Sequence, residues 1–578
     1  MKIIKLNFDF PQIVAALSFM ITFFFVSSNA QEKDRSYYDS LYNRLMIEIG
    51  LSDNENVARV SSENEIIKCQ FGLRSEIKTN LSQFTPAQQA KLQSVLARPQ
   101  LQKSIVSQSG FFRIHFDTTG SSAPAYVPNL SAEQNAMLVA EAFDSSYSFE
   151  VDYLGYPAPP DDEENGGDIL YDVYVVNLGN GTYGYTEPDF AKPTGSQKHT
   201  SYIVIDNDYV GSFNTHGTEA MKVTAAHEFH HSIQMGNYIY RSEDLFFYEL
   251  TSTSMEEFVF NDVNDYHAYV YSYFNNTNRV FSKNPNNNLY GYDLALWNIF
   301  IADTLNIDII KRQWQLMPNM RAMDAINTSL VENGSSFSEK LNEFGIWCYY
   351  TNYRAKPDQY FEDAAELPVT VRSLSSMEFT SNSKSVSASS TPASNLYITF
   401  YKKLSGFPDT LTVMISNFDF KSAVSNQNSS FAFDYTLYDH PEPGASKLSP
   451  DYYFKFNSEN STSWSTAEIL NDELIKGAVF TEGEIDYVFP SPFYYTKNSY
   501  ILIPAKFDAF RGTDLNIYTS SMDLVYSSSV TVQKIFGQTV VRWNALDNSG
   551  NKLATGVYLY AVKTGDETST GKIVIFNE

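Results

Sequence analysis

The stretch AAHEFHHSIQ, residues 225–234, holds three of the eight histidines of this 578-residue chain within five positions. It belongs to the run TEAMKVTAAHEFHHSIQM, for which Thr218 is a candidate N-cap, so we expect a helix. His227 and His231 are four residues apart, which places both imidazoles on one face of that helix, where they can reach one zinc ion. The five residues from His227 to His231 read H-E-x-x-H. Glu228 is offset around the helix from the two histidines, so it can reach a zinc-activated water without binding the metal.

The segment SEDLFFYELTSTSMEEFVF, residues 242–260, predicts a second helix, which Ser242 can cap. If this helix runs antiparallel to the first, Glu249 lies at nearly the same depth as His231, at a rise of about 1.5 Å per residue. We therefore expect Glu249 to be the third zinc ligand, with Glu256 as the alternative; a solvated helix charge is the simpler interpretation of Glu249. The groups positioned to hold the histidines by hydrogen bonds are Ser252, Thr253 and Glu256.

Together these residues predict a zinc-dependent enzyme that hydrolyses peptide bonds. Glu228 would take the proton of the zinc-activated water as general base and pass it to the leaving amine. The tetrahedral intermediate needs a donor for its oxyanion, and Tyr290, Tyr292 and His267 are candidates. A polypeptide substrate could add as a strand along a sheet edge, for which GTYGYTEPDF, residues 181–190, is the candidate.

The chain is too long for one hydrophobic core, so we expect several domains. Residues 31–105 have helical periodicity and are a candidate pro-segment. Over residues 106–365 the strand-like FRIHFDTTG, ILYDVYVVNLG and TSYIVIDNDYV precede helical segments, which predicts an α+β domain with a mixed sheet and a helical subdomain. Short alternating segments predict a β-sandwich over residues 366–525 and a separate small β domain over residues 526–578.

The N-terminus has the pattern of an export signal. Lys2 and Lys5 precede the apolar run 13–28, and small residues then lead to Gln31, so we expect residues 1–30 to be removed. An uncleaved membrane anchor is the alternative, but the run is short for a span, and no later run is long enough to cross a bilayer. The net charge of −26 argues against binding to nucleic acid or to anionic membranes. We expect a secreted or cell-surface monomer.

The two cysteines and two acidic stretches are further candidates for a function. Cys69 and Cys348 are the only cysteines, and a disulfide between them or two buried thiols are the simple interpretations. If residues 31–105 are a pro-segment, however, the Cys69 thiolate could bind the zinc and keep the enzyme latent. The acidic stretches DDEENGGD (161–168) and NDVNDY (261–266) could hold calcium, although solvated acidic loops are commoner.

The segments VTAAHEFHHSIQMGNY, ELTSTSMEEFVFNDVNDY and LYGYDLALW resemble a family of secreted bacterial zinc metalloproteases of the gluzincin type, known mainly from genome sequences. The likeness covers about residues 106–365. It implies a zincin-like metallopeptidase domain with zinc on His227, His231 and Glu249 and with Glu228 as the catalytic residue. The sequence departs from the family where Ser254 precedes Met255, because related chains often have Trp there.

The C-terminal stretch WNALDNSGNKLATGVYLYAVKTGDETSTGKIVIFNE, residues 543–578, resembles the immunoglobulin-like sorting domains that are read by the type IX secretion system. This resemblance implies passage across the outer membrane, with the secretion machinery as a partner. Flagellar hook-cap modules share the Trp-Asn…Gly-Val-Tyr pattern, so an accessory surface domain is the alternative. For the whole chain, the alternative to a protease is a surface adhesion or carbohydrate-binding protein with a structural or degenerate zinc site.

Overall fold

The computed structural model describes residues 35–51, 68–179, 181–283, 291–370, 377–403 and 408–577, without short stretches at 420–421, 424–428, 459–462, 476–479, 483–487, 489–491, 497, 499, 506–512, 536–537 and 566. The expected signal peptide, residues 1–30, lies outside these ranges. The chain forms two compact units. The first takes in residues 1–64 and 73–97, and the second takes in residues 65–72 and 98–578.

The first unit is helical, as the periodicity of this region predicts. Its helices are α2 (Arg35–Glu48), most of α4 (Phe71–Thr79), the short η1 (Leu81–Gln83) and α5 (Pro86–Val95). Helix α5 begins at a capping box, in which Thr85 and Gln88 each accept a hydrogen bond from the backbone of the other. The apolar side chains that these helices bury against one another are Tyr38, Leu45, Met46, Leu73, Ile77, Phe84, Leu92 and Leu96.

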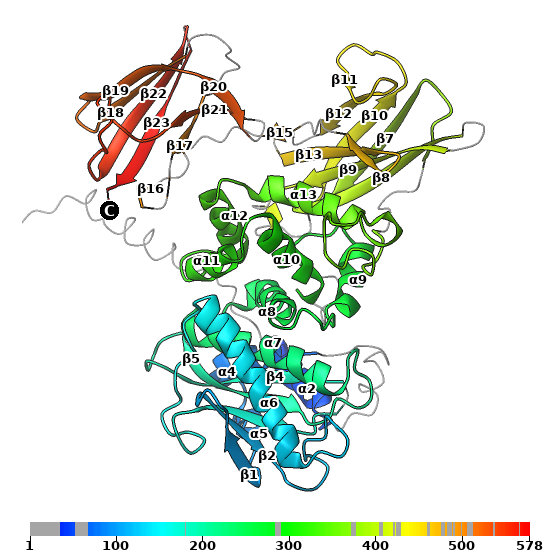
Figure 1. Cartoon of the computed structure of the whole chain (residues 1–578), viewed down its shortest axis with the longest axis vertical. Coiled ribbons are helices and arrows are strands. Elements are labelled where there is room, and N and C mark those ends of the chain that lie inside the picture. Colours follow the sequence, from blue (N-terminus) through cyan, green and yellow to red (C-terminus); the bar gives the residue numbers. More distant parts are fainter. Residues whose placement is uncertain are drawn as a thin grey trace, which may run out of the picture. The chain divides into compact units, whose positions relative to one another are not determined.

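The second unit contains a five-stranded mixed sheet with the strand order β1-β2-β3-β5-β4. Figure 1 labels its strands β1, β2, β4 and β5. Its strands are β1 (Lys103–Val106), β2 (Phe112–Phe116), β3 (Tyr171–Val176), β4 (Gly184–Ala191) and β5 (His199–Asp206). The three central strands β2, β3 and β5 are parallel, whereas β4 runs antiparallel to β5 and forms one edge. The three strand-like segments of the sequence are thus the central strands, and GTYGYTEPDF contains the edge strand β4.

Helices α6 (Ala132–Tyr147) and α7 (Gly217–Asn237) pack against each other and against the sheet. Helix α6 starts at a capping box formed by Ser131 and Gln134. Among the described residues, six α-helices follow α7, and Figure 1 shows them as a helical layer of the same unit. They are α8 (Leu245–Val259), α9 (His267–Asn275), α10 (Ala295–Thr304), α11 (Asp308–Leu316), α12 (Ala322–Glu332) and α13 (Phe337–Tyr349). The α+β composition expected for this region is therefore present.

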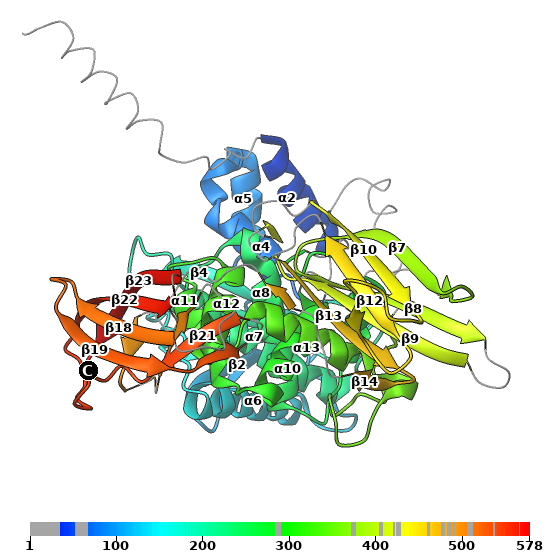
Figure 2. The same ribbon diagram turned by 90° about the horizontal axis from the view of Figure 1, so that it is seen from above.

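A β-sandwich follows the helices. One sheet has the order β11-β12-β10-β7 and the other has the order β14-β13-β9-β8-β6, with β15 beside β13. Figure 2 shows the longer strands of both sheets, among them β7, β10, β8 and β9. The strands are β6 (Met377–Glu378), β7 (Ser383–Ser390), β8 (Ser394–Lys403), β9 (Pro408–Asn417), β10 (Phe431–Tyr438), β11 (Ser446–Lys447), β12 (Tyr453–Ser458), β13 (Ser463–Leu470), β14 (Glu473–Ile475) and β15 (Phe480–Glu482). Both sheets bury aromatic and β-branched side chains between them, which fits the expected sandwich.

The C-terminal strands form two further sheets with one shared core, ordered β16-β23-β22-β18-β19 and β17-β21-β20. Their bounds are β16 (Phe493–Tyr494), β17 (Ile501–Pro504), β18 (Thr513–Thr519), β19 (Leu524–Val530), β20 (Val532–Ile535), β21 (Gln538–Trp543), β22 (Gly556–Thr564) and β23 (Glu567–Phe576). This group of C-terminal strands starts before the expected boundary at residue 526, because β18 pairs with β22 and β16 pairs with β23. Such pairings across long loops leave no mark in the local sequence pattern.

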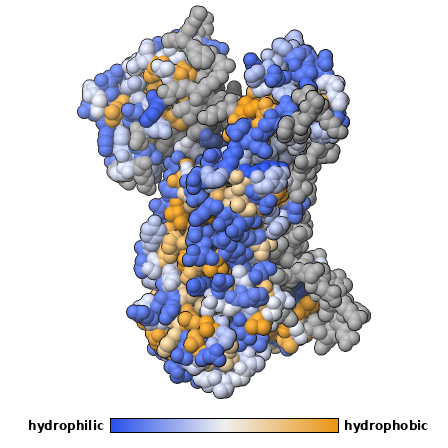
Figure 3. Space-filling model, turned by 45° about the vertical axis from the view of Figure 1, so that its right-hand side comes forward, coloured by the Kyte–Doolittle hydropathy of each residue, from blue (hydrophilic) through white to orange (hydrophobic). Residues whose placement is uncertain are grey.

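Among the described residues, no helix has both the length and the apolarity that a membrane span requires. The face of the molecule drawn in Figure 3 is largely hydrophilic, with scattered hydrophobic patches.

Candidate metal centre

Helix α7 carries the H-E-x-x-H pentad in a fully buried stretch. Close packing against the sheet is possible because Gly184 of β4 has no side chain: a Cβ at this position would lie 2.9 Å from Thr224 Cγ2 and 3.3 Å from Glu228 Cγ. The helix begins at Gly217, with His216 rather than Thr218 at the N-cap. Gly217 has φ +55°, which lets the chain turn sharply into the helix without a side-chain cap.

Helix α8 packs against α7, as the antiparallel arrangement requires, but it starts later than expected. Residues Ser242–Asp244 form a 3-10 turn, and the α-helix begins at Leu245, so Ser242 is not its cap. The carboxylate of Asp244 instead accepts two hydrogen bonds from Arg321, at 2.8 and 3.0 Å. This partner is 77 residues away, so the local sequence could not indicate it.

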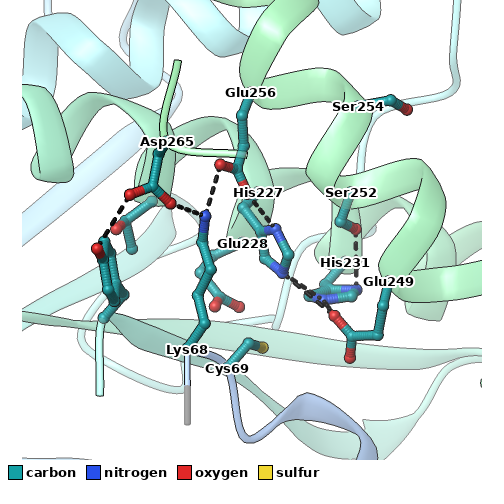
Figure 4. A network of polar contacts seen from close by, with 12 residues as sticks. Lys68, Cys69, His227, Glu228, His231, Glu249, Ser252, Ser254, Glu256 and Asp265 are labelled. Carbon is teal, nitrogen blue, oxygen red and sulfur yellow. Dashed lines mark hydrogen bonds and ion pairs between the residues drawn. The ribbon is translucent and has the colours of Figure 1, made fainter. Parts of the chain in front are cut away.

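The side chains of His227, His231 and Glu249 meet at one point (Figure 4). The two Nε2 atoms are 3.1 Å apart, and each lies 3.3 Å from Oε2 of Glu249. The structure therefore brings Glu249 to the histidines, the same carboxylate that the comparison of helix depths selected from the sequence. Both histidines and Glu249 are buried.

These distances fit a metal ion of the size and geometry of zinc. Four ligand atoms placed tetrahedrally at about 2.1 Å from an ion lie about 3.4 Å from one another. The three separations of 3.1, 3.3 and 3.3 Å are close to that value. Two imidazole nitrogens and a carboxylate oxygen are also the donor types that zinc takes in catalytic sites.

The far nitrogens of both imidazoles are held by hydrogen bonds. Nδ1 of His227 donates to Oε1 of Glu256 at 2.7 Å, so Glu256 lies behind a histidine and is not itself at the metal position. Nδ1 of His231 donates to Oε1 of Gln234 at 2.8 Å and lies 3.1 Å from the Ser252 hydroxyl. These bonds leave each Nε2 with its lone pair toward the centre, as metal ligation requires.

The three expected supporting residues thus have different outcomes. Ser252 and Glu256 contact the histidines as expected. The Thr253 hydroxyl is buried and has no hydrogen-bond partner among the described residues, so it does not hold a histidine. Gln234 was missed by the sequence argument, although its position three residues after His231 on the same helix was a usable signal.

The charges of the centre stabilise one another. Burial acts to raise the pKa of Glu249, but the neighbouring His231 and His227 outweigh it and lower that pKa to about 2. Burial likewise acts to lower the pKa of His227, and hydrogen bonds with Glu249 and Glu256 raise it to about 9. The centre is therefore built to keep the Glu249 carboxylate ionised in a buried place.

Glu228 is buried beside the three candidate ligand residues and is not in the candidate metal group. The Thr186 hydroxyl lies 2.9 Å from its Oε2 and 2.8 Å from its backbone carbonyl, so the edge strand β4 holds this carboxylate in place. A carboxylate fixed next to a metal position, but outside the set of ligands, can serve as a general base.

The candidate oxyanion donors differ in whether they contact the metal centre. The Tyr292 ring stacks on the His227 imidazole, with 5.7 Å between centroids, and burial followed by the Glu249 charge raises the pKa of its hydroxyl. The Tyr292 ring can lie this close to His227 because the preceding residue, Gly291, has no side chain. A Cβ at that position would lie 2.2 Å from the Phe246 carbonyl oxygen. His267 contacts Asp363 at 3.4 Å and is not in the metal group.

Tyr290 lies outside the described residues. Tyr292 is thus the candidate donor that the described structure brings to the centre.

A fourth potential ligand comes from the N-terminal region. The ligand atoms of Cys69, His227, His231 and Glu249 all lie within 4.8 Å of one another. Cys69 and Cys348 are both buried free thiols, so the disulfide alternative is wrong. Burial, followed by the charges of Glu228 and Glu249, raises the pKa of the Cys69 thiol.

The remaining polar candidates have other partners. His230 is outside the metal group, as expected, and its Nδ1 lies 2.7 Å from the buried Glu150 carboxylate. In the acidic loop 161–168, the three aspartates pair with cationic side chains of the same unit. These pairs are Asp161 with Lys192, Asp162 with Arg98, and Asp168 with Arg113. These three carboxylates, which might otherwise hold calcium, therefore already balance positive charges.

No protein-family model matches the chain, and no curated protein matches it. One solved structure that it matches is PorZ, described as an essential bacterial surface component of the type-IX secretion system of human oral-microbiomic Porphyromonas gingivalis. The two are 15% identical, with a TM-score of 0.14. The match covers 29% of this chain and 29% of PorZ, so the chain spans under a third of that protein.

Proposed function

We propose that this protein is a secreted zinc-dependent metallopeptidase. The observation that carries the proposal is the convergence of His227, His231 and Glu249 at tetrahedral separations, with Glu228 fixed beside them and outside the ligand set. A structural zinc site would need no such carboxylate, because closed sites leave no place for a reacting water. The mixed sheet with an antiparallel edge strand next to the H-E-x-x-H helix supports a zincin-like fold.

When bound, zinc supplies Lewis acidity, which polarises the substrate carbonyl and lowers the pKa of water. The protein supplies the rest of the chemistry. Glu228 accepts the proton of the attacking water at its carboxylate and delivers it to the nitrogen of the leaving amine. Thr186 keeps this carboxylate oriented through the bond to Oε2. Tyr292, whose ring is stacked on His227, is the proposed donor to the oxyanion.

The edge strand β4 supports a substrate-binding role for this side of the sheet. It pairs only with β5 among the strands of its sheet and has the metal-carrying helix packed against it. A polypeptide substrate can add to such an edge through main-chain hydrogen bonds. We also propose export across the outer membrane by the type IX system, on the strength of the C-terminal sequence resemblance.

The proposed activity is tested with casein or gelatin as substrate. The exported chain and a chain starting at Arg98, where the second unit resumes, are each assayed with and without a zinc chelator, and zinc content is measured in parallel. We expect chelator-sensitive hydrolysis that Glu228→Gln lowers by about 10²–10⁴-fold, the usual contribution of a general base. Bound zinc without Glu228-dependent hydrolysis in either form would instead favour the adhesion or carbohydrate-binding alternative.

A further inference from the structure

Residues 68–72 run directly through the candidate metal centre. Lys68, Cys69, Gln70 and Phe71 are all buried, and this short segment belongs to the same compact unit as helices α7 and α8. The residues on either side of it, up to Asn64 and from Leu73 to Ala97, belong to the N-terminal unit. A piece of the N-terminal region is therefore built into the site where substrate would be cleaved.

We propose that Cys69 is a fourth metal ligand and that residues 68–72 block the substrate position, which keeps the full-length protein latent. This inference rests on the proposed function, because it concerns the same metal site. With a thiolate in the fourth position, four protein ligands would close the site and exclude the reacting water. The sulfur atom already lies within 4.8 Å of the other three ligand atoms, and in Figure 4 it points toward them.

The main chain of the segment occupies the edge of the sheet. The Lys68 carbonyl accepts hydrogen bonds from the backbone nitrogens of Tyr183 and Gly184, at 3.0 and 3.4 Å, and Cys69 forms a parallel bridge with Gly184. An added substrate strand would need these same backbone groups of β4. Segment and substrate therefore compete for one edge.

Side chains fix the segment in that place. The Phe71 ring stacks on the His231 imidazole, with centroids 4.0 Å apart and planes at 9°. The Phe71 backbone N–H lies 3.3 Å from the Cys69 sulfur, a donor that stabilises thiolate charge. The Gly72 carbonyl accepts a hydrogen bond from the Tyr240 hydroxyl at 3.0 Å. Each contact is with a metal ligand, with Cys69 or with a residue just after helix α7.

The chain also offers a way to release the segment. Arg98, just after the N-terminal unit, is held in the second unit by ion pairs with Asp162, Asp172 and Asp189. A cut between residues 73 and 97 would leave Arg98 attached and would free the N-terminal fragment, with Cys69, to leave. The reacting position would then be open to water and substrate.

The test is cobalt substitution in the exported full-length protein. A thiolate bound to cobalt gives a sulfur-to-metal charge-transfer band in the near ultraviolet, which reports ligation independently of activity. We expect this band in wild type and in the matched control Cys348→Ser, and we expect its loss in Cys69→Ser with stoichiometric cobalt still bound. Cys69→Ser and Cys69→Ala should also hydrolyse casein without processing, and circular dichroism checks their folding.

Each outcome decides a separate point. Stoichiometric cobalt without the band in wild type would overturn the role of Cys69 and leave the peptidase proposal standing. The band could appear in wild type while neither folded Cys69→Ser nor the processed chain hydrolyses casein. That result would support Cys69 as a metal ligand and would overturn the proposed peptidase function. A protein that binds neither zinc nor cobalt would overturn both.

The side chain of Lys68 carries a second proposal, on substrate choice. Its ammonium group pairs with Glu256 at 2.6 Å and with Asp265 (Figure 4). It also lies over the rings of Tyr183 and Tyr269. The side chain is 1% exposed. When the segment leaves, these two carboxylates lose their cation and meet water, and a substrate side chain that covers them again would leave their charge uncompensated unless it is itself a cation.

We infer that this acidic pocket takes a lysine or arginine side chain of the substrate next to the scissile bond. Lys68 is adjacent to Cys69, so the pocket lies one residue from the metal position. The remaining oxygen of each carboxylate is already bonded: Glu256 accepts from His227, and Asp265 accepts from Thr215 at 2.7 Å. One cation completes the pocket, whereas a neutral side chain would leave both charges unpaired.

The test uses a folded chain starting at Arg98, which lacks Lys68, with peptides that differ only in carrying Lys, Arg or Gln beside the cleaved bond. We expect kcat/KM to favour Lys or Arg by about thirtyfold or more, the usual cost of truncating one partner of a buried charge pair. Asp265→Asn should lower that ratio by about tenfold, since it removes one of the two charges. Equal cleavage of all three peptides would overturn the pocket and leave the peptidase intact, and no cleavage of any peptide would overturn both.

Discussion

Replacement of Lys68 by Gln tests the latent form most directly. In the folded full-length protein the lysine neutralises Glu256 and Asp265, neither of which is exposed to solvent. The amide of glutamine is shorter and uncharged, so both carboxylates would remain buried without a counter-ion. Once the segment has left the site, the same carboxylates meet water. The substitution therefore destabilises the latent form much more than the open form.

The magnitude follows from the cost of breaking a buried ion pair, about 3–5 kcal/mol. We take the lower end, about 3 kcal/mol, because a buried carboxyl can take up a proton instead of staying charged. A difference of this size changes the ratio of open to latent protein by a factor of about 10². The variant should expose its site about a hundred times more often than the wild type.

The readout is the rate at which Cys69 reacts with a disulfide reagent in zinc-loaded protein. The thiol is buried and reacts only from the open form, so the rate should rise about a hundredfold with the population of that form. Cys348, buried in helix α13, is the internal control and should stay unreactive. Lys222→Gln changes an exposed lysine on helix α7 and should react as the wild type does.

One result would refute this reasoning. In folded Lys68→Gln, Cys69 could react with the reagent at a rate within about twofold of the wild-type rate, which corresponds to a free-energy change under about 0.5 kcal/mol. In that case the lysine does not hold the segment in place. Lys68→Arg should show intermediate behaviour, because it keeps the charge but not the length. Reaction of Cys348 at the same faster rate would mean global unfolding rather than release of the segment.

Three other predictions concern the metal, one helix and the sandwich. In the Cys69→Ser background, Glu249→Ala should abolish stoichiometric zinc after dialysis, measured by metal analysis, because only His227 and His231 of the ligand set remain; retained zinc would contradict this ligand set. Ser131→Ala removes half of a capping box and should cost about 1 kcal/mol in denaturant unfolding, whereas Ser145→Ala on the exposed side of α6 should cost less. Burial raises the pKa of Glu468 on β13 from 4.5 to about 7, so stability is fully present below pH 4.5 and is lost as pH rises through 7. Glu468→Gln should remove that loss, up to about 3 kcal/mol at pH 8, and calorimetry showing parallel pH dependence in both proteins would contradict it.

Local sequence pattern predicts the metal helix and its partner because their information is local. The spacing of His227 and His231 specifies a shared helix face, and the short turn between two helices specifies that Glu249 comes to their level. The helix ends were less predictable. Thr218 has the residue type of a cap, but Gly217 with positive φ makes the turn one residue earlier.

Long-range contacts mark the limit of such prediction. Lys68 is 188 and 197 residues from its two partners, and no spacing rule connects positions that far apart. The beginning of the C-terminal β unit was hidden in the same way, because β18 belongs to it only through pairing with β22. Cys69 was a candidate for latency from its isolation in the sequence, and its place beside the histidines required the folded chain.

Glu256 connects the two halves of the site. One carboxylate oxygen accepts from Nδ1 of His227 at 2.7 Å, and the other pairs with Lys68 at 2.6 Å. Loss of the lysine therefore changes the charge around the same carboxylate that orients a metal ligand. A more anionic Glu256 makes the His227 imidazole a stronger donor to the metal, since a hydrogen-bonded carboxylate raises ligand basicity. Departure of the segment would thus open the fourth position and, through one shared side chain, strengthen the hold of the remaining ligands on the ion.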